Sequence, residues 1–81
     1  MSVSDQIRTI ASDIFGVSAD KITAASTPKT IEAWDSIQHL NLVLALEEKF
    51  GLQLSPEEIE QMKSMGEVIK LVEGKLQAAA N

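Results

Sequence analysis

Two side chains that could do chemistry lie three residues apart in the middle of the chain, the hydroxyl of Ser36 and the imidazole of His39. Because residues at this spacing come near each other on a helix, a serine nucleophile activated by a histidine base is one interpretation. No orienting acid or oxyanion site accompanies the pair in a recognisable arrangement, and 81 residues leave little room for a substrate pocket. We therefore expect no catalytic residues and no enzyme.

Ser36 stands at the predicted start of a helix that begins at Asp35 or Ser36 and ends at Phe50. Asp35 is a good N-cap, and Gln38 three residues later predicts a capping box. The helix N-terminus offers a positive dipole end and free N–H groups, which suit a phosphate on the Ser36 hydroxyl. Alternatively Ser36 is only part of the cap, and position alone does not separate these readings. His39 is expected either at the rim of the fold or in solvent.

The composition argues against several classes of function. The chain has no cysteine and one histidine, so we expect no disulfide and no metal site, and no carboxylate loop of the calcium-binding kind is found. The formal net charge is −5 and no basic stripe is present, which argues against nucleic-acid binding. Six carboxylates stand against one lysine between residues 35 and 60. This stretch is either a surface for basic partners or an ordinary solvated face.

No segment reaches the ~20 apolar residues that would span a membrane, and Met1–Ile10 lacks the apolar run of a signal peptide. We therefore expect a soluble, cytoplasmic protein without membrane insertion. Hydrophobic residues make up 44% and charged residues 23% of the chain, as is typical of a folded protein. A chain of 81 residues has room for one domain, predicted over 1–81, and we expect a monomer.

Four segments of the chain have the apolar spacing of helices, and no sustained strand pattern occurs. The first is predicted from Val3 or Asp5 to Phe15. A serine just before it can cap its start, and Gly16 can end it in a left-handed conformation. The second is the helix that begins at Asp35 or Ser36.

Residues 17–34 are predicted to form a long loop, because the helical spacing fades there and serine, threonine and proline are frequent. Such a loop is unusual in a small domain unless it is functional or pinned by its own side chains. Its spaced apolar anchors are Ile22, Ile31 and Trp34.

A short third helix near Pro56–Met62 and a fourth over Met65–Ala79 complete the pattern. Each follows a serine that precedes a glutamate by three residues, the signature of a capping box. The predicted fold class is therefore all-α, a small four-helix bundle with a long first loop and a short third helix. The capping pairs are Ser55 with Glu58 and Ser64 with Glu67.

The second helix carries apolar residues on two faces. A domain of this size has a thin core, which cannot cover both faces completely. One face, with Ile37, Leu40 and Leu44, is therefore predicted to be a surface for partner proteins. The other is an ordinary core stripe of Leu42, Val43, Leu46 and Phe50.

Taken together, these residues resemble the acyl carrier protein family. Asp35-Ser36-Ile37 alone is a tripeptide that occurs by chance, but here it stands in register with an acidic end of the second helix, a short third helix and a capped fourth one. The resemblance covers essentially the whole chain. It rests on Trp34 to Ile37, Leu42 to Gly51, Leu54 to Ile59 with Met62, and Ser64 to Val68.

The resemblance implies that Ser36, next to Asp35, carries 4′-phosphopantetheine, transferred from coenzyme A by a phosphopantetheinyl transferase. The terminal thiol of that group would hold acyl cargo as thioesters, so the carrier needs no cysteine of its own. Partners would be acyl-loading and acyl-processing enzymes of fatty-acid, polyketide or related lipid biosynthesis, such as ketosynthases or acyltransferases. The surface presented to them would consist of Ile37, Leu40, Leu44, Glu47 and Glu48.

In the fatty-acid carriers of this family the bundle interior can open to shelter an acyl chain, and the resemblance implies the same here. Trp34 before the motif, and Gln38, His39 and Asn41 where acids are common, indicate a specialised member outside housekeeping fatty-acid synthesis. The predicted acyl-cavity residues are Leu42, Val43, Leu46, Phe50, Leu54, Ile59, Met62, Val68 and Leu71.

Two other functions stay open on the sequence. The same scaffold could carry an amino acid, as an aminoacyl or peptidyl carrier, a reading that Trp34 favours. It could also be an unmodified helical docking domain that binds a partner through the apolar stripe alone, in which case Ser36→Ala would leave function intact.

Overall fold

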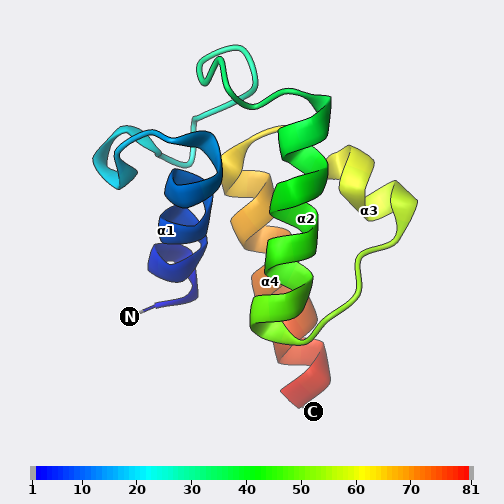
Figure 1. Ribbon diagram of the computed structural model, residues 1–81. Coiled ribbons are helices and arrows are strands. Elements are labelled where there is room, and N and C mark those ends of the chain that lie inside the picture. Colours follow the sequence, from blue (N-terminus) through cyan, green and yellow to red (C-terminus); the bar gives the residue numbers. More distant parts are fainter. Residues whose placement is uncertain (1, 81) are drawn as a thin grey trace.

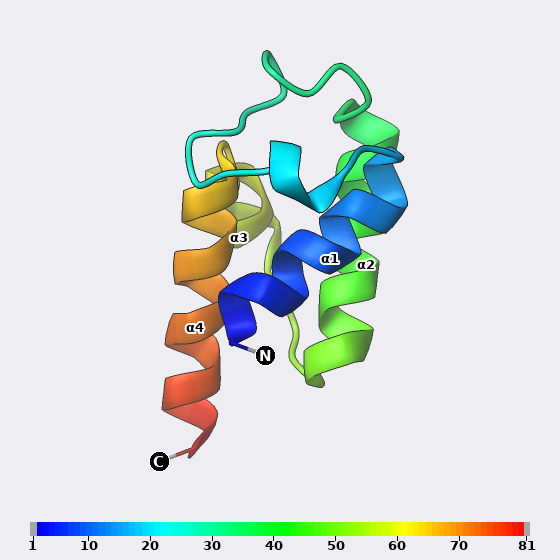
Figure 2. The same cartoon turned by 90° about the vertical axis from the view of Figure 1, so that its left-hand side faces the viewer.

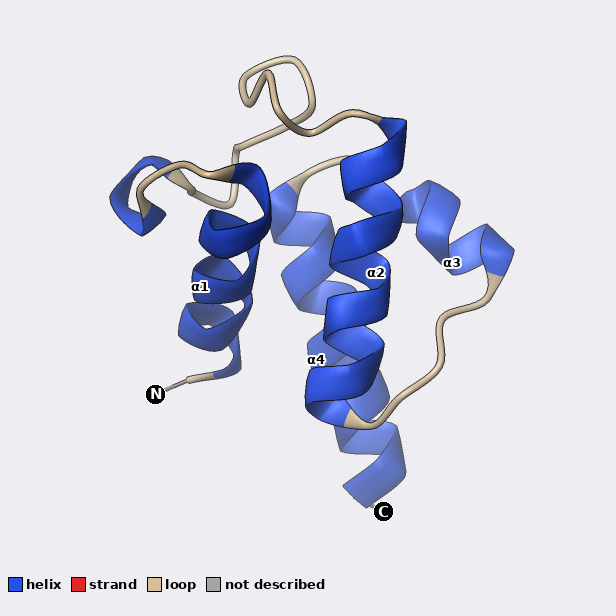
Figure 3. Cartoon of the chain, viewed as in Figure 1, coloured by secondary structure: helices blue, strands red, loops and turns tan. Residues whose placement is uncertain are grey.

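The computed structural model describes residues 2–80, and within that range the chain folds into helices and turns without a strand (Figures 1 and 3). The predicted all-α fold class is confirmed. The elements are α1 (Val3–Phe15), the short 3-10 helix η1 (Ala19–Lys21), α2 (Ser36–Phe50), α3 (Pro56–Gln61) and α4 (Met65–Ala80).

Three of the helices stand side by side, with α1 packed on both α2 and α4 (Figures 1 and 2). α1 runs opposite to α2 and α4, and the short α3 lies beyond α2 on the side away from α1 (Figure 1). The loop of residues 17–35 crosses the end of the bundle at which both α2 and α4 begin. This arrangement places the start of α2 under the loop and beside α3.

Helix ends follow local chemistry, largely as predicted. Ser2 caps α1 by accepting the N–H of Asp5 at 3.1 Å. Gly16 and Gly51 end α1 and α2 with φ of 69° and 64°, a left-handed conformation that favours glycine because it has no Cβ. These end signals are confirmed.

Only one of the two hydrogen bonds of the capping box predicted for α2 is present. Asp35 accepts the N–H of Gln38 at 2.8 Å, but the Gln38 side chain does not return to the backbone of Asp35. Instead its amide donates to the Ile14 carbonyl at 3.2 Å and accepts from Asn41 at 2.8 Å. Gln38 therefore ties the first turn of α2 to the last turn of α1, a tertiary contact that local spacing cannot reveal.

The third and fourth helices begin with the predicted serines. At α3 the capping box of Ser55 and Glu58 is complete in both directions. At α4 the Ser64 hydroxyl accepts the N–H of Glu67 at 3.2 Å and donates to the Glu67 carboxylate at 3.4 Å. The short α3 thus owes its start to a local cap, which a helix of six residues needs.

Packing between α1, α2, α4 and the loop forms the core. Its aliphatic side chains are removed from water, and each stabilises the fold by about 1.5–3 kcal/mol. The loop anchors Ile22, Ile31 and Trp34 are all buried, as predicted. The largest fully buried side chains are Ile7, Ile22, Leu42, Leu46, Met65, Val68 and Val72.

The loop is also pinned to α4 by its backbone. The N–H of Met65 donates to the Ser26 carbonyl at 2.8 Å, and that of Gly66 donates to the Ala24 carbonyl at 2.9 Å. These bonds satisfy N–H groups in the first turn of α4 that have no partner within the helix. The loop therefore acts as a fixed cover on this end of the bundle.

A second clamp comes from α1. Arg8 donates to the carbonyls of Ala19 and Ile22, each at 3.0 Å, and so holds η1 against the first helix. The sequence did not predict η1, because three residues without apolar spacing give no periodic signal.

Candidate functional site

Ser36 is the first residue of α2, and its side chain is exposed at the end of the bundle that the loop crosses. The helix is capped by Asp35, which accepts the N–H of Gln38. Within residues 2–80, the Ser36 hydroxyl makes no hydrogen bond. The hydroxyl is therefore available to a modifying enzyme.

Other serines at helix starts behave differently from Ser36. The hydroxyls of Ser2, Ser55 and Ser64 each accept a backbone N–H of the helix that follows. At α2 that role already belongs to Asp35, so Ser36 has no part in the cap. The geometry favours the reading in which Ser36 does chemistry over the reading in which it only caps.

An open groove of about 860 Å³ includes Ser36 and lies between the start of α2, α3 and the loop. Its apolar floor contains Trp34 and Met62, each only 2% exposed. Charges of both signs surround it, with Lys29 and Lys63 against Asp35 and Glu60. The groove is lined by Thr27, Pro28, Lys29, Trp34, Asp35, Ser36, His39, Leu40, Ile59, Glu60, Met62 and Lys63.

His39 is half-buried in the wall of this groove and uses both of its ring nitrogens. The indole N–H of Trp34 donates to Nδ1 at 2.8 Å, and Nε2 lies 3.0 Å from the Ile59 carbonyl. An indole can only donate and a carbonyl can only accept, so Nδ1 is the acceptor and Nε2 is the donor in these two bonds. Of the two sequence predictions for His39, the position at the rim is confirmed and the solvated one is wrong.

Those two bonds also decide whether His39 could act as a base that activates Ser36. A base for the Ser36 hydroxyl would need a free acceptor nitrogen, and the acceptor Nδ1 of His39 is occupied by Trp34. His39 instead links the loop, α2 and α3 through one ring.

The predicted partner stripe lies on the surface. Ile37 is 73%, Leu40 55% and Leu44 62% exposed, so three large apolar side chains of α2 face solvent. Leu40 also lines the groove that contains Ser36. The stripe therefore starts beside the exposed hydroxyl and continues along α2.

The two predicted acids beyond the stripe differ. Glu48 is exposed, whereas Glu47 is half-buried and accepts the N–H of Leu54 at 2.9 Å. Glu47 therefore holds the link between α2 and α3 in place.

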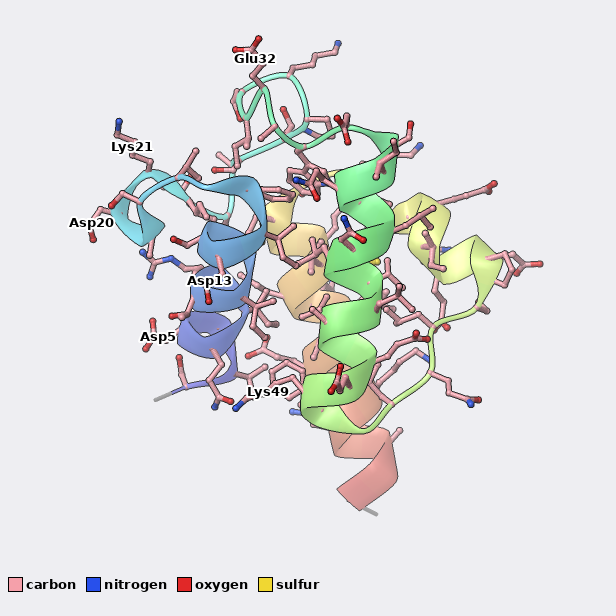
Figure 4. The ribbon with its side chains drawn as sticks, in the orientation of Figure 1. Asp5, Asp13, Asp20, Lys21, Glu32 and Lys49 are labelled. Carbon is pink, nitrogen blue, oxygen red and sulfur yellow. The ribbon has the colours of Figure 1, made fainter. Side chains whose placement is uncertain are left out.

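Lys49 lies at the opposite end of α2 from Ser36, while Asp5 and Asp20 project from the α1 side (Figure 4).

The nine predicted cavity residues pack mostly into the closed core. Two of them, Ile59 and Met62, line the groove at Ser36; Leu42 and Leu46 are completely buried and do not. That the interior can admit an acyl chain stays a prediction. The buried members are Leu42, Val43, Leu46, Leu54, Met62 and Val68, and the partly buried ones are Phe50, Ile59 and Leu71.

Sequence reasoning missed the part of the groove that comes from the loop and from the link between α3 and α4. Thr27, Pro28 and Lys29 form one wall, and Lys63 contributes to another. The buried anchor Ile31 signalled that the loop packs against the fold, but nothing in the local pattern says on which face.

One ion pair holds α3 to α4. The ammonium of Lys75 lies 2.9 Å from the Glu58 carboxylate, which also accepts the N–H of Ser55 at 2.9 Å. The Ser55 backbone hydrogen bond, and then Lys75, lower the pKa of Glu58 below its ordinary value of 4.5. The wall of the groove that α3 supplies is thus fastened at both faces, by His39 and by Lys75.

Among residues 2–80, none of the helices combines the length and the apolar composition that a membrane span requires. No group of three or more histidine, aspartate or glutamate side chains in the same residues is placed to hold a metal ion.

The sequence of this chain matches a known protein family. The family model described as a phosphopantetheine attachment site matches residues 5–72. An acyl carrier protein of Akkermansia muciniphila is 36% identical over 74 residues, covering 89% of this chain and 90% of the relative. An acyl carrier protein of Chlamydia trachomatis is 33% identical over 73 residues, covering 90% and 95%.

The fold has a solved counterpart as well. A solution NMR structure of a holo acyl carrier protein from Geobacter metallireducens superimposes with a TM-score of 0.87. It is 28% identical in sequence, and the match covers 99% of this chain and 92% of that one. Sequence and structure therefore point to the same family.

Proposed function

The chain belongs to the acyl carrier protein family, and from this premise we propose that Ser36 is the residue that holds its 4′-phosphopantetheine. The protein is a carrier and not an enzyme, and its cargo is an acyl group. The observation that carries the assignment is the exposed, unbonded hydroxyl of Ser36 beside a helix cap that Asp35 already completes.

The residues around Ser36 fit a phosphodiester. The first turn of α2 presents its N–H groups and the positive end of its dipole at that position. Lys29 and Lys63 line the same groove and offset the negative charge of Asp35 and Glu60. When bound, the group supplies a terminal thiol that carries the acyl chain as a thioester.

Ser36 must act as the nucleophile when it is modified. Its oxygen loses a proton and forms a new bond to phosphorus, while the pyrophosphate bond of coenzyme A breaks and adenosine 3′,5′-bisphosphate leaves. His39 does not take this proton, because Trp34 occupies its acceptor nitrogen. We propose that the phosphopantetheinyl transferase supplies the base.

Partner enzymes in acyl biosynthesis are implied by the family, and we propose that they dock on the exposed stripe of Ile37, Leu40 and Leu44. Such partners include the transferase and acyl-loading or acyl-processing enzymes such as acyltransferases and ketosynthases. Exposed apolar side chains with Glu48 at their far end suit a partner that offers an apolar patch with basic residues beside it.

The test is intact-mass analysis after incubation with coenzyme A and a broad-specificity phosphopantetheinyl transferase. The wild-type chain should gain the mass of one phosphopantetheine, and Ser36→Ala should gain none. A matched control is Ser55→Ala, which removes a serine that caps α3 and should leave the modification intact. A wild-type chain that several such transferases leave unmodified would contradict the proposal.

A further inference from the structure

In contrast to the interior acyl cavity expected from the sequence, we propose that Trp34 and His39 close the route from Ser36 into the bundle interior, so that this carrier keeps its acyl group in the surface groove. The inference rests on the proposed function and names its cargo class. That class is acyl groups short or polar enough to remain in an open groove, rather than long apolar chains that need the core.

Trp34 belongs both to the groove and to the core. Trp34 lines the groove at Ser36, yet it is only 2% exposed, so nearly all of it lies inside the fold. Behind it the ring of Phe15 stacks at 5.3 Å between centroids, with an interplanar angle of 28°. Phe15 belongs to α1 and to the core cluster. Trp34 therefore stands between the groove and the apolar interior.

His39 is bonded to residues on two other elements. Its ring lies 6.0 Å from that of Trp34 between centroids, nearly parallel to it at 20°; it accepts the indole N–H and donates to the Ile59 carbonyl. These contacts join the end of the loop, α2 and α3 into one layer at the groove. To pass this layer, an acyl chain would have to separate α3 from α2 and leave an indole N–H and an imidazole without partners in an apolar site.

The two sides of this layer differ in their exposure to water. Below it, Leu42, Leu46 and Val68 are completely buried. Above it, the groove of about 860 Å³ is open to solvent and carries four charged side chains on its rim. The rim charges favour cargo that stays partly hydrated, and a long hydrocarbon chain would remain exposed there.

The test uses the full-length carrier, loaded at Ser36 by the transferase with non-hydrolysable amide analogues of butanoyl- and dodecanoyl-coenzyme A. Methyl-resolved NMR compares the two loaded forms. In the wild type both analogues should shift the signals of Ile59 and the Trp34 indole N–H. The methyl signals of Leu42, Leu46 and Val68 should stay unchanged with either. Movement of those core methyls with the dodecanoyl analogue would overturn the inference.

Two variants test whether the layer itself is responsible. His39→Ala removes the bridge between Trp34 and Ile59, and the dodecanoyl analogue should then shift the core methyls. Trp34→Phe keeps an aromatic ring but loses the N–H, and it should give a smaller shift in the same direction. Unchanged core methyls in both variants would show that other residues close the interior. Failure of the wild type to load at Ser36 would overturn the proposed function as well, whereas loading followed by core shifts overturns this inference alone.

Discussion

At the scale of single residues, the site depends on a division of roles between Asp35 and Ser36. The Asp35 carboxylate accepts an N–H at the start of the helix, and this leaves the Ser36 hydroxyl free to react. A serine at the cap position could not do both, because a hydroxyl that accepts a helix N–H is held in place by the backbone. The reactive hydroxyl therefore requires a capping residue immediately before it.

This division predicts the outcome of changing Asp35. Asp35→Ala should lower the free energy of unfolding by about 1 kcal/mol, because the N–H of Gln38 loses its acceptor. Asp35→Asn keeps an acceptor oxygen and should lose much less. Urea unfolding followed by circular dichroism measures both. Equal losses for the two variants would mean that Asp35 acts through its charge and not through the cap.

How far single residues were predictable depends on the range of their contacts. Ser36, its cap and the exposed stripe follow from local sequence, since each involves residues within one or two helical turns. The roles of His39 and Gln38 do not, because their partners Ile59 and Ile14 lie 20 and 24 residues away. Their bonds exist only once the helices have packed.

At the scale of elements, α2 separates its two faces cleanly. Leu44 is 62% exposed and Leu46 is fully buried, although both are leucines of the same helix. Leu46→Ala should cost about 2–5 kcal/mol of unfolding free energy, whereas Leu44→Ala should change it by less than about 0.5 kcal/mol. Chemical denaturation of the two variants gives both values. Comparable destabilisation would mean that the exposed stripe is part of the core.

The exposed face of α2 leads to a separate prediction, about the action of partner enzymes. Leu44→Glu should leave the circular dichroism spectrum and melting temperature close to wild type, because the side chain already lies in water. It should lower the rate at which partner enzymes act on the carrier, since a charge replaces an apolar contact at the docking surface. The measurement is the initial rate of transfer to the carrier, with Glu32→Gln, far out on the loop, as the control (Figure 4).

The attachment of α3 to α4 should depend on pH. The pKa of Glu58 is lowered in the folded protein, so its stabilising contribution is present above the ordinary value of 4.5. That contribution is lost as the pH falls below this value and through the lowered pKa. The stability difference between wild type and Glu58→Gln should accordingly be constant near neutral pH and shrink in acid. Thermal melts at several pH values check this, and a difference that grows in acid would contradict it.

At the scale of the whole molecule, the loop and α4 meet at a close backbone contact. A Cβ on Gly66 would lie 3.0 Å from the Ala24 carbonyl oxygen, whereas one on Gly74 would meet nothing within 4 Å. Gly74→Ala should therefore stabilise α4 by up to about 1 kcal/mol, through helix propensity alone. Gly66→Ala should destabilise, because the loop must move away. Thermal melts of the two variants measure both effects. Stabilisation by both substitutions would show that the loop is not fixed at this contact.

The four helices could be predicted because the periodicity of the sequence is strong there, and their observed bounds are close to the expected ones. The path of residues 17–35 was not, because backbone bonds such as those from Met65 and Gly66 leave no pattern in the side chains. For the same reason the groove could not be foreseen. It arises where the loop, α2 and α3 converge, and only Ile59 and Met62 of its lining were singled out beforehand as cargo contacts.

The most direct test of the account is the position of the added mass in the modified carrier. Fragmentation mass spectrometry of the chain treated with coenzyme A and transferase should place one phosphopantetheine on Ser36. The capping serines Ser2, Ser55 and Ser64 should remain unmodified, because their hydroxyls serve helix starts. Phosphopantetheine found on any other serine, or none on the chain, would contradict the claim that the free hydroxyl at the start of α2 is the attachment point.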